Sequence, residues 1–425
     1  MSLGRRRIAR TLALSVGLLA GCDDVAPPEP VRLGLLAAFT AAGNEGNGVI
    51  ERRSVQLAVE EANAAGGVIP GRRVELVAID YGETYATVVA AAETVAAAGL
   101  AAMVGPEPSK AEVFIGGQFV DARLPHVSCC ASSDMLSDFA GQSGMDRYFF
   151  RTTPPDSEEA VVTSRLVREC GACTSLVVFQ QDDAFGVSFA SRLVADLAAN
   201  GGPPIAATVA FTQGQTSYAA AVQSAGTSTA GCVVVVGFPS EAALLVRNWQ
   251  TYVGRPVTWF ASSSILSPVF TSEIGNPALA QGIRVAAATA DPLDPQVAAF
   301  RALYEGRFRE APSLIYGARN YDAAALLLLA MARAGSTDGA AIRDALFEVS
   351  RPDPDDVVIG PGDLTKGISL LRRGIGIDYD GASGPVDFDA SGNVTAEYEI
   401  LRYDATAMPI SLGLVRSGAP LACGP

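Results

Sequence analysis

The chain has 425 residues, of which 45 are acidic and 31 basic, and its formal net charge at pH 7 is −14. An acidic surface repels nucleic-acid phosphates, and no cluster of Lys and Arg follows Arg10, so we expect no nucleic-acid partner. A structural zinc site takes four ligands, whereas the chain has one Cys-x-x-Cys pair, Cys170 and Cys173, and a single histidine. We expect neither a metal nor another cofactor.

The first 21 residues have the features of a secretory signal peptide. Arginines at positions 5 to 7 precede an apolar run from Leu12 to Gly21, which is too short to cross a bilayer. The run ends in Leu19-Ala20-Gly21-Cys22, which resembles the bacterial lipobox. We therefore expect lipidation of Cys22, which becomes the new N-terminus. The alternative is an ordinary signal peptide with an incidental cysteine.

The residues after Cys22 predict how the protein is held in the cell envelope. Asp23-Asp24 resembles the signal that retains some lipoproteins in the inner membrane, and residues 22–30, with three prolines, form a short tether. The prediction is an exported protein at the periplasmic face of the inner membrane. Its lipid is the expected membrane attachment, because no second long apolar run follows.

Export also bears on the charge and on the cysteines. Residues 1–21 hold four of the 31 basic residues and none of the acidic ones, so the remaining 404 residues carry a net charge of −18. Apart from Cys22, six cysteines remain, and in an oxidising compartment they predict disulfides, with 15 possible pairings. We expect a local disulfide between Cys170 and Cys173, which flank Gly171-Ala172. Free thiols are the alternative.

From residue 31 onward, short apolar runs alternate with helical patterns. Strands are first predicted at 31–36, 74–79, 101–105 and 126–128, with helices at 55–62, at 85–96 and from about residue 109. The pattern pauses at 149–155 and starts again. Strands are then predicted at 175–180, 205–211, 232–237 and 257–260, helices at 185–199, 240–253, 294–309, 318–333 and 339–349, and hairpin-like segments at 384–389 and 398–403. Two such runs predict two similar α/β lobes, each with a parallel sheet.

Four segments in the right order carry a family resemblance: Gln56 to Gly67 with Pro70-Gly71-Arg72, Phe150 to Pro154, Asn320 to Ala324, and Gly384 to Gly392. Together they are similar to the branched-chain amino acid (Leu/Ile/Val-type) periplasmic binding proteins, and the similarity extends from Val31 to about Leu414. It implies a two-lobed periplasmic-binding-protein type I fold with three hinge crossovers, which closes on a ligand by hinge motion. Lobe 1 would hold 31–152 and 286–378, and lobe 2 would hold 153–285 and 379–418.

The resemblance also implies ligand-binding positions. In lobe 1, Ser109 matches the serine that binds the ligand carboxylate, Cys130 a backbone carbonyl that meets the amino group, and Ser132 a threonine that offers its hydroxyl and N–H. In lobe 2, Phe185 and Phe238 match aromatic positions. The alternatives are helix capping for Ser109 and core packing for the two phenylalanines.

Position 264 departs from the family. Amino-acid binders carry an acidic residue near this point that pairs with the ligand's ammonium group, whereas this chain has Ser264. A buried ammonium without a counter-charge costs several kcal/mol, so either the ligand lacks that group or another acid replaces the missing one. The candidate acids are Asp182, Asp183, Asp322 and Glu107. Tyr321, in the helix-start motif, completes the predicted ligand contacts.

These features predict a solute-binding lipoprotein that captures an amino acid or a related small carboxylate or amide and delivers it to an ABC permease. The alternative is a receptor-like ligand sensor, because the same bilobal module serves both roles. We expect no enzymatic activity. The one histidine, His126, follows Pro125 in a predicted strand, where core or loop packing is its expected role.

Overall fold

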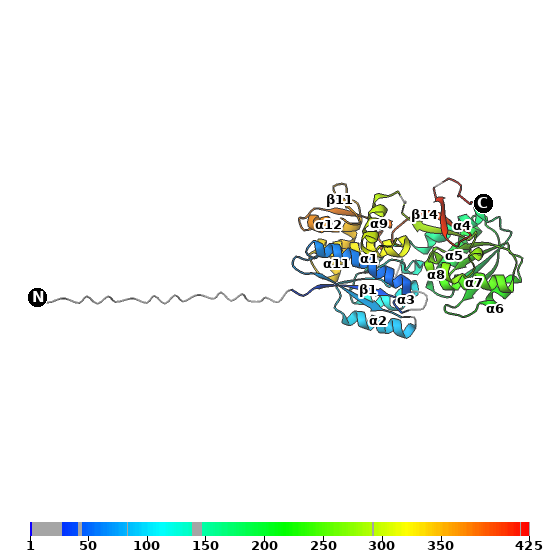
Figure 1. Ribbon diagram of the computed structural model, residues 1–425, viewed down its shortest axis with the longest axis horizontal. Coiled ribbons are helices and arrows are strands. Elements are labelled where there is room, and N and C mark those ends of the chain that lie inside the picture. Colours follow the sequence, from blue (N-terminus) through cyan, green and yellow to red (C-terminus); the bar gives the residue numbers. More distant parts are fainter. Residues whose placement is uncertain are drawn as a thin grey trace.

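The structure is a computed structural model that describes residue 1 and residues 28–40, 45–82, 84–137, 147–290, 293–416 and 418–424. The predicted signal peptide, the lipobox and Cys22 lie outside the described residues, as does most of the tether. From residue 31 onward the described chain forms two lobes, each with its own sheet flanked by helices (Figure 1).

A five-stranded parallel sheet forms the centre of lobe 1, with the strand order β2-β1-β3-β4-β5. Its strands are β1 (Val31–Ala37), β2 (Val74–Asp80), β3 (Ala102–Val104), β4 (His126–Ser128) and β5 (Phe149–Arg151). The first four match the predicted strands. Most of their side chains are buried and apolar, as expected for strands covered on both faces.

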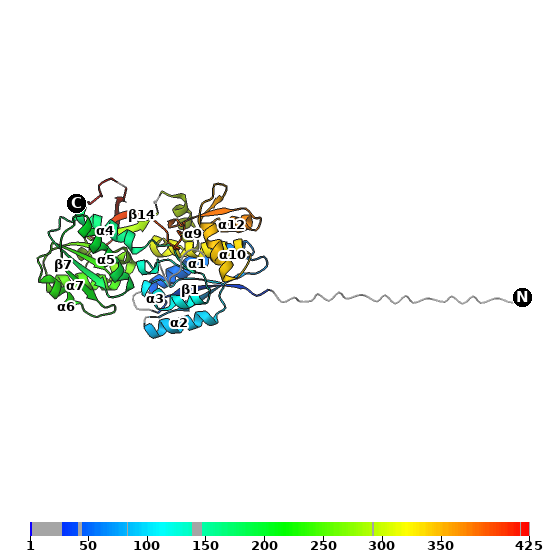
Figure 2. The same cartoon turned by 180° about the vertical axis from the view of Figure 1, so that it is seen from behind.

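The helices of lobe 1 come from two distant parts of the chain. The early ones are α1 (Glu45–Ala64), α2 (Tyr85–Ala97) and α3 (Ser109–Asp121). The later ones are α9 (Pro295–Phe308), α10 (Arg319–Ala334), α11 (Gly339–Ser350) and α12 (Leu364–Leu371). Both views show the later block beside α1, against which α10 and α12 pack (Figure 2). A small sheet accompanies this block, with β11 (Val357–Ile359), β12 (Ile377–Gly381) and β13 (Gly384–Pro385).

Helix α10 is the central helix of lobe 1. Every residue from Arg319 to Ala332 is buried, and from Ala323 to Ala332 the sequence is entirely apolar, as expected for a helix surrounded by the core. A π-helical turn, Leu314–Ala318, precedes it, and this turn reaches the boundary between the lobes. No single helix of the described residues is long and apolar enough to span a membrane, and the one consecutive pair that reaches such a length, Leu314–Ala334 with Gly339–Ser350, is bent by 111°.

A seven-stranded sheet forms lobe 2, in the order β15-β14-β10-β9-β8-β6-β7. Strands β6 to β10 are parallel, whereas β14 pairs antiparallel with β10 and β15. The strands are β6 (Leu176–Gln181), β7 (Ile205–Phe211), β8 (Cys232–Val236), β9 (Thr258–Ala261), β10 (Arg284–Thr289), β14 (Glu397–Tyr403) and β15 (Pro409–Leu414). The helices are α4 (Asp156–Cys170), α5 (Ala184–Ala199), α6 (Ala219–Gly226), α7 (Pro239–Tyr252) and α8 (Pro268–Glu273). Short 3-10 turns occur at Asp134–Leu136 in lobe 1 and at Ser263–Ile265 and Pro277–Leu279 in lobe 2.

The chain passes between the lobes three times, and two of the predicted boundaries need correction. The boundary at 285/286 lies inside β10, which belongs to the sheet of lobe 2. The boundary at 378/379 lies inside β12, and Tyr379, Val386, Phe388 and Val394 pack in the core of lobe 1. The crossings therefore follow β5, β10 and Val394.

The disulfides also differ from the prediction. Cys170 does not pair with Cys173: Cys170 pairs with Cys423 and Cys173 pairs with Cys232. The two cysteines diverge because Cys170 ends α4, while Ala172 in the left-handed conformation turns the chain toward β6. Both bonds lie in lobe 2, where they join segments 253 and 59 residues apart in sequence. The third disulfide joins the neighbours Cys129 and Cys130 in lobe 1.

Candidate functional site

A cavity lies between the two lobes at the carboxyl ends of their parallel strands. Its walls come from the loops after β3 and β4 in lobe 1, the segments after β6, β8 and β9 in lobe 2, and the chain around the starts of α4 and α10. Crevices outside the carboxyl ends of parallel strands are where open α/β sheets bind ligands. The empty volume is about 610 Å³, including the space open to solvent.

Hydrogen bonds cross between the lobes beside this cavity. Lys110 Nζ donates to Gln213 Oε1 at 2.8 Å, Ser133 Oγ donates to the Ala184 carbonyl at 3.1 Å, and the Asp134 N–H donates to Ser188 Oγ at 3.0 Å. Each bond joins lobe 1 to lobe 2. The lobes are therefore in contact across the cleft, as in a closed arrangement.

Six of the seven predicted ligand positions line this cavity: Ser109, Cys130, Ser132, Phe185, Phe238 and Ser264. The seventh prediction, Tyr321, is wrong. Its hydroxyl donates to Glu61 and accepts from the Gly362 N–H in the interior of lobe 1. Tyr321 lies two residues after Arg319 on α10, and two residues correspond to about 200° of rotation. Arg319 therefore reaches the cavity while Tyr321 points into the core.

Lobe 1 offers hydrogen-bond donors at the start of α3. Ser109 is the first residue of this helix and is buried, and its Oγ accepts a hydrogen bond from the Ser133 N–H at 3.0 Å. The hydroxyl does not cap the helix, since the capping residue is Pro108, and a hydroxyl that accepts one bond can still donate its own proton. The first N–H groups of a helix also lack partners within the helix. This end of the cavity suits a carboxylate.

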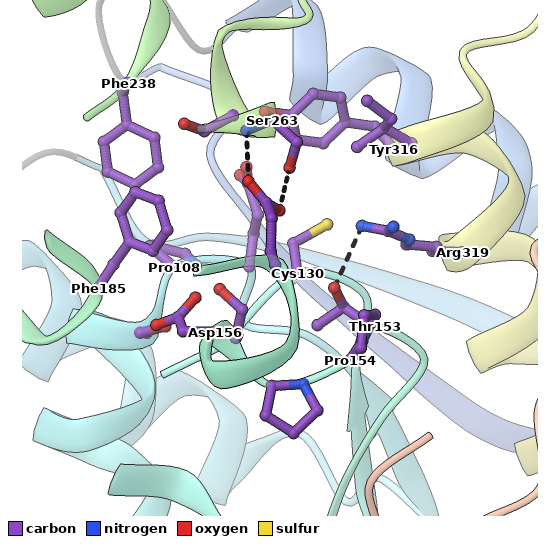
Figure 3. Close-up of a pocket in the computed structure, with 17 residues that line it drawn as sticks. Pro108, Cys130, Thr153, Pro154, Asp156, Phe185, Phe238, Ser263, Tyr316 and Arg319 are labelled. Atoms are coloured by element: carbon purple, nitrogen blue, oxygen red, sulfur yellow. Dashed lines mark hydrogen bonds between the residues drawn. The ribbon is translucent and has the colours of Figure 1, made fainter. Parts of the chain in front are cut away.

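The two other predicted positions of lobe 1 have partners of their own. The Ser132 side chain hydrogen-bonds to the Asp156 carboxyl, and its carbonyl accepts from the Asp156 N–H at 2.7 Å. Cys130 is bonded to Cys129 and lies among the residues that line the cavity (Figure 3). Ser132 therefore joins the lobe 1 wall to the start of α4.

An aromatic wall comes from lobe 2. The rings of Phe185 and Phe238 are stacked, with centroids 5.7 Å apart and an interplanar angle of 24° (Figure 3). Phe185 stands in the first turn of α5 and Phe238 directly before α7. Both line the cavity and both also pack against the lobe 2 core. Phe185 and Phe238 therefore line the cavity, as predicted, and also pack in the core, as the alternative proposed.

A carboxylate reaches the neighbourhood of Ser264 from a different element. Glu159, in the first turn of α4, accepts the Ser263 N–H at 2.7 Å and the Ser263 hydroxyl at 2.6 Å. Dashed lines mark these two bonds beside Ser263 (Figure 3). Burial raises the pKa of Glu159 to about 7, and the two bonds from Ser263 oppose that rise. The family resemblance predicts an acidic residue near position 264, so the sequence analysis did not identify Glu159. The available signal was the acidic start of a helix directly after the lobe crossing.

Asp156 is a second cavity carboxyl from the same helix turn. It is the first residue of α4 and is buried. Its Oδ2 has no hydrogen-bond partner among the described residues. Burial raises its pKa well above the ordinary value of an aspartate, partly offset by the bond from Ser132 and the charge of Arg151. The sequence prediction missed this residue too.

Among the described residues, Arg319 is the one guanidinium group on the cavity wall. Its Nη1 donates to Thr153 Oγ1 at 3.1 Å (Figure 3), and its Nη2 donates to the Ala288 carbonyl at 3.1 Å. Thr153 follows the first lobe crossing, and Ala288 lies at the end of β10, before the second. Arg319 thus ties two crossings to α10, and its burial lowers its pKa.

Of the four acids proposed to replace a residue at 264, Glu107 alone lines the cavity. Asp183 caps α5 by accepting the Gly186 N–H at 2.9 Å, and Asp182 is exposed outside the cavity. Asp322 accepts hydrogen bonds from Tyr379 and from the backbone after β12, inside lobe 1. Among the described residues, the cavity wall therefore holds three carboxyl groups, Glu107, Asp156 and Glu159, and one guanidinium group.

His126 lies in the interior of lobe 1. Its Nε2 contacts Glu112 Oε1 at 2.8 Å and its Nδ1 contacts the Leu124 carbonyl at 3.0 Å. Its side chain is fully buried, and it is not among the residues that line the cavity. The packing role expected for His126 is confirmed.

The fold and the interlobe cavity define a two-lobed binding protein of the periplasmic type I class. Residues 30–404 match the family model described as periplasmic binding protein, and the chain therefore belongs to that family. The predicted resemblance to Leu/Ile/Val-type binding proteins and the predicted fold class are confirmed by this match and by the relatives below.

Among curated proteins, the chain is similar to the chemotactic signal transduction system substrate-binding protein BasB of Halobacterium salinarum, with 28% identity over 383 residues, 85% of this chain and 84% of the relative. Among solved structures, it is similar to the leucine binding protein LivK from Thermotoga maritima, with a TM-score of 0.76, 18% identity, and coverage of 91% of this chain and 99% of that chain.

Two further structures share the fold. LivJ from Streptococcus pneumoniae in complex with isoleucine gives a TM-score of 0.71 at 21% identity, with 90% of this chain and 99% of that chain covered. A solute-binding protein from R. palustris in complex with benzoate gives 0.72 at 14% identity, with 91% and 96% covered. At these identities the structures establish the common fold.

Proposed function

We propose that this chain is the solute-binding component of an ABC importer and that it captures an amino acid or a related small solute bearing an ammonium group. The observation that carries the proposal is that hydrogen-bond donors from one lobe and carboxyl groups from the other line the same cavity. Ser109 and the start of α3 offer donors from lobe 1, while Glu159 and Asp156 offer carboxyls from lobe 2.

A zwitterion would use both sides of this cavity. Its carboxylate would accept hydrogen bonds from Ser109 and the α3 N–H groups. Its ammonium group would donate to Glu159, which takes the role that the family gives to an acid near position 264. The aromatic wall of Phe185 and Phe238 would cover an apolar side chain. Because such a ligand contacts both lobes, it binds the closed arrangement more tightly and shifts the hinge toward it.

A thermal-shift screen with matched solutes tests this proposal. L-Leucine is compared with 4-methylpentanoate, which lacks the amine, and with isoamylamine, which lacks the carboxylate. The zwitterion should give the largest shift, because a solute at a hundredfold excess over its Kd stabilises the folded state by about 2.7 kcal/mol. If no ammonium-bearing solute among the amino acids, amines and amides raises the melting temperature, the proposal fails. A shift produced by carboxylates alone would also contradict the role of Glu159.

The envelope location belongs to the same proposal. The acceptor of the solute would be an ABC permease, reached from a lipid anchor on Cys22 at the inner membrane. Growth of the producing cell with labelled fatty acid should label the wild-type protein, whereas Cys22→Ala should remain unlabelled. Label on the Cys22→Ala protein would contradict the anchor.

A sensor role is the second candidate, favoured by one observation. BasB, to which the chain is 28% identical, is described as part of a chemotactic signal transduction system. Deletion of the gene in its own organism separates the roles. Loss of solute uptake with normal chemotaxis supports the importer, whereas loss of chemotaxis toward the same solute with normal uptake supports the sensor.

A further inference from the structure

A buried acidic pair lies at the lobe 1 side of the cavity. Glu107 lines the cavity and is 4% exposed, and Glu51 of α1 stands behind it at 1% exposed. The two carboxyls interact directly. Even so, Oε1 of Glu51 and Oε2 of Glu107 have no hydrogen-bond partner among the described residues. Two buried carboxyl groups thus each have an oxygen without a partner, and one of these groups, Glu107, lines the cavity.

No basic side chain of the described residues lies within ion-pair distance of either carboxyl. Arg319, the guanidinium of the same cavity, is committed to Thr153 and the Ala288 carbonyl. The other groups that face the pair are phenols: Tyr81 after β2 and Tyr316 in the turn before α10. A buried charge normally has a counter-charge, and among the described residues no cation pairs with Glu51 or Glu107.

The folded protein can avoid two unpaired buried charges if the pair of carboxyls keeps a proton. Burial raises the pKa of both Glu51 and Glu107, and the charge of Glu107 raises the pKa of Glu51 further. Hydrogen bonds with Glu51 and Tyr81 partly offset the rise at Glu107. A proton is thus held where a counter-ion is missing. A ligand cation entering the cavity would replace this proton and satisfy Glu107 Oε2, with the hydroxyl of Tyr316, which also lines the cavity, as a further acceptor.

We infer that Glu107, reinforced by Glu51, is a subsite for a second cationic group of the solute. The ligand class then narrows to small solutes with two nitrogen cations, such as basic amino acids or short diamines. This inference rests on the proposed function, because it assumes that the solute occupies the interlobe cavity. In it Glu107 contacts the ligand, and Glu51 is a positioning residue that increases the negative charge behind it.

A pair of matched amino acids tests the inference. L-Lysine and L-norleucine have the same carbon skeleton and differ by the terminal amine. Calorimetric titration of the full exported chain should give a Kd for lysine that is about 10- to 100-fold lower than for norleucine, the range of a hydrogen bond to a charged group. In Glu107→Gln this ratio should fall toward one. Ornithine, arginine and putrescine extend the panel to other spacings.

Glu61→Gln is the matched control. Glu61 lies on the same helix as Glu51, its pKa is also raised by burial, and it contacts Tyr321 away from the cavity. This control should preserve the ratio. A second readout is the proton: titrations in buffers of different ionisation enthalpy near pH 6 should show about one proton released on binding lysine, and Glu51→Gln should reduce it.

The outcomes separate the two proposals. Binding of norleucine as tight as that of lysine overturns the subsite and leaves the amino-acid proposal standing. Binding of none of the basic amino acids or putrescine also overturns the subsite, whatever neutral amino acids do. Failure of every ammonium-bearing solute removes both. An unchanged lysine preference in Glu107→Gln, with a folded variant shown by circular dichroism, would place the second cation elsewhere and contradict the inference.

Discussion

Replacing Glu159 with Gln should stabilise the unliganded protein at alkaline pH and weaken the capture of ammonium-bearing solutes. The substitution preserves the local geometry, because the Gln carbonyl can accept the Ser263 N–H. Its amide can donate to the Ser263 hydroxyl, which then accepts instead of donating. What the substitution removes is a charge that burial disfavours. The same charge is the one proposed to hold the ligand's ammonium group.

The magnitude follows from the pKa of Glu159. Burial moves it from an ordinary value near 4.5 to about 7, and each pKa unit corresponds to about 1.4 kcal/mol. Because the folded state holds the proton more tightly than the unfolded state, this carboxyl costs no stability below about pH 4.5. The cost grows as the pH rises through 7. Above pH 7 this cost is at most about 3 kcal/mol. Glu159 is partly exposed to the cavity, and screening by solvent there reduces the cost below that limit.

Tryptophan fluorescence during thermal unfolding measures this cost in the relevant lobe. Both tryptophans of the chain, Trp249 and Trp259, lie in lobe 2, with ring centroids 5.7 Å apart. At about 2 to 4 °C per kcal/mol, Glu159→Gln should unfold up to roughly 5 to 10 °C higher than wild type at pH 8 and at nearly the same temperature at pH 4.5. Glu158→Gln, one residue away and outside the cavity lining, should leave solute affinity unchanged. An equal stability difference at both pH values would refute the reasoning.

Two other changes have defined outcomes. Ser109→Ala should raise the Kd of carboxylate-bearing solutes about tenfold, since it removes one donor of a charge-assisted hydrogen bond. It should leave isoamylamine binding unchanged in calorimetric titration. An equal loss of affinity for both kinds of solute would show that the carboxylate does not bind at Ser109. Cys173→Ala with Cys232→Ala opens a loop of 59 residues and should destabilise lobe 2 by about 4 kcal/mol, on the chain-entropy account. Denaturant unfolding followed by tryptophan fluorescence measures this change, and no loss of stability would contradict it.

The fold could be predicted from the sequence wherever apolar runs were unambiguous. The valine-rich run of β8 and the mixed run of β1 are buried parallel strands as predicted. Strand β10 was missed because its residues Val285 to Ala288 include three alanines, which favour helices at least as well as strands. That omission moved the second lobe boundary into β10.

The site was predictable in part, for a physical reason. Residues that follow parallel strands, such as Ser109 and Cys130, gather at one edge of a sheet regardless of side-chain detail. Glu159 and Arg319 approach from helices whose positions depend on how the two lobes close, which local sequence patterns do not encode. The disulfide partners of Cys170 and Cys173 are similarly set by long-range packing rather than by spacing.

The direct test of solute capture between the lobes is hydrogen–deuterium exchange of the full exported chain with and without its best solute. Saturation should slow exchange at the same time in the segments around Ser109 and Ser132 of lobe 1 and around Glu159 and Ser263 of lobe 2. Protection confined to one lobe would contradict capture between the lobes. Protection centred on the groove lined by Pro268, Leu314 and Met408, with none around Ser109 or Glu159, would contradict it as well.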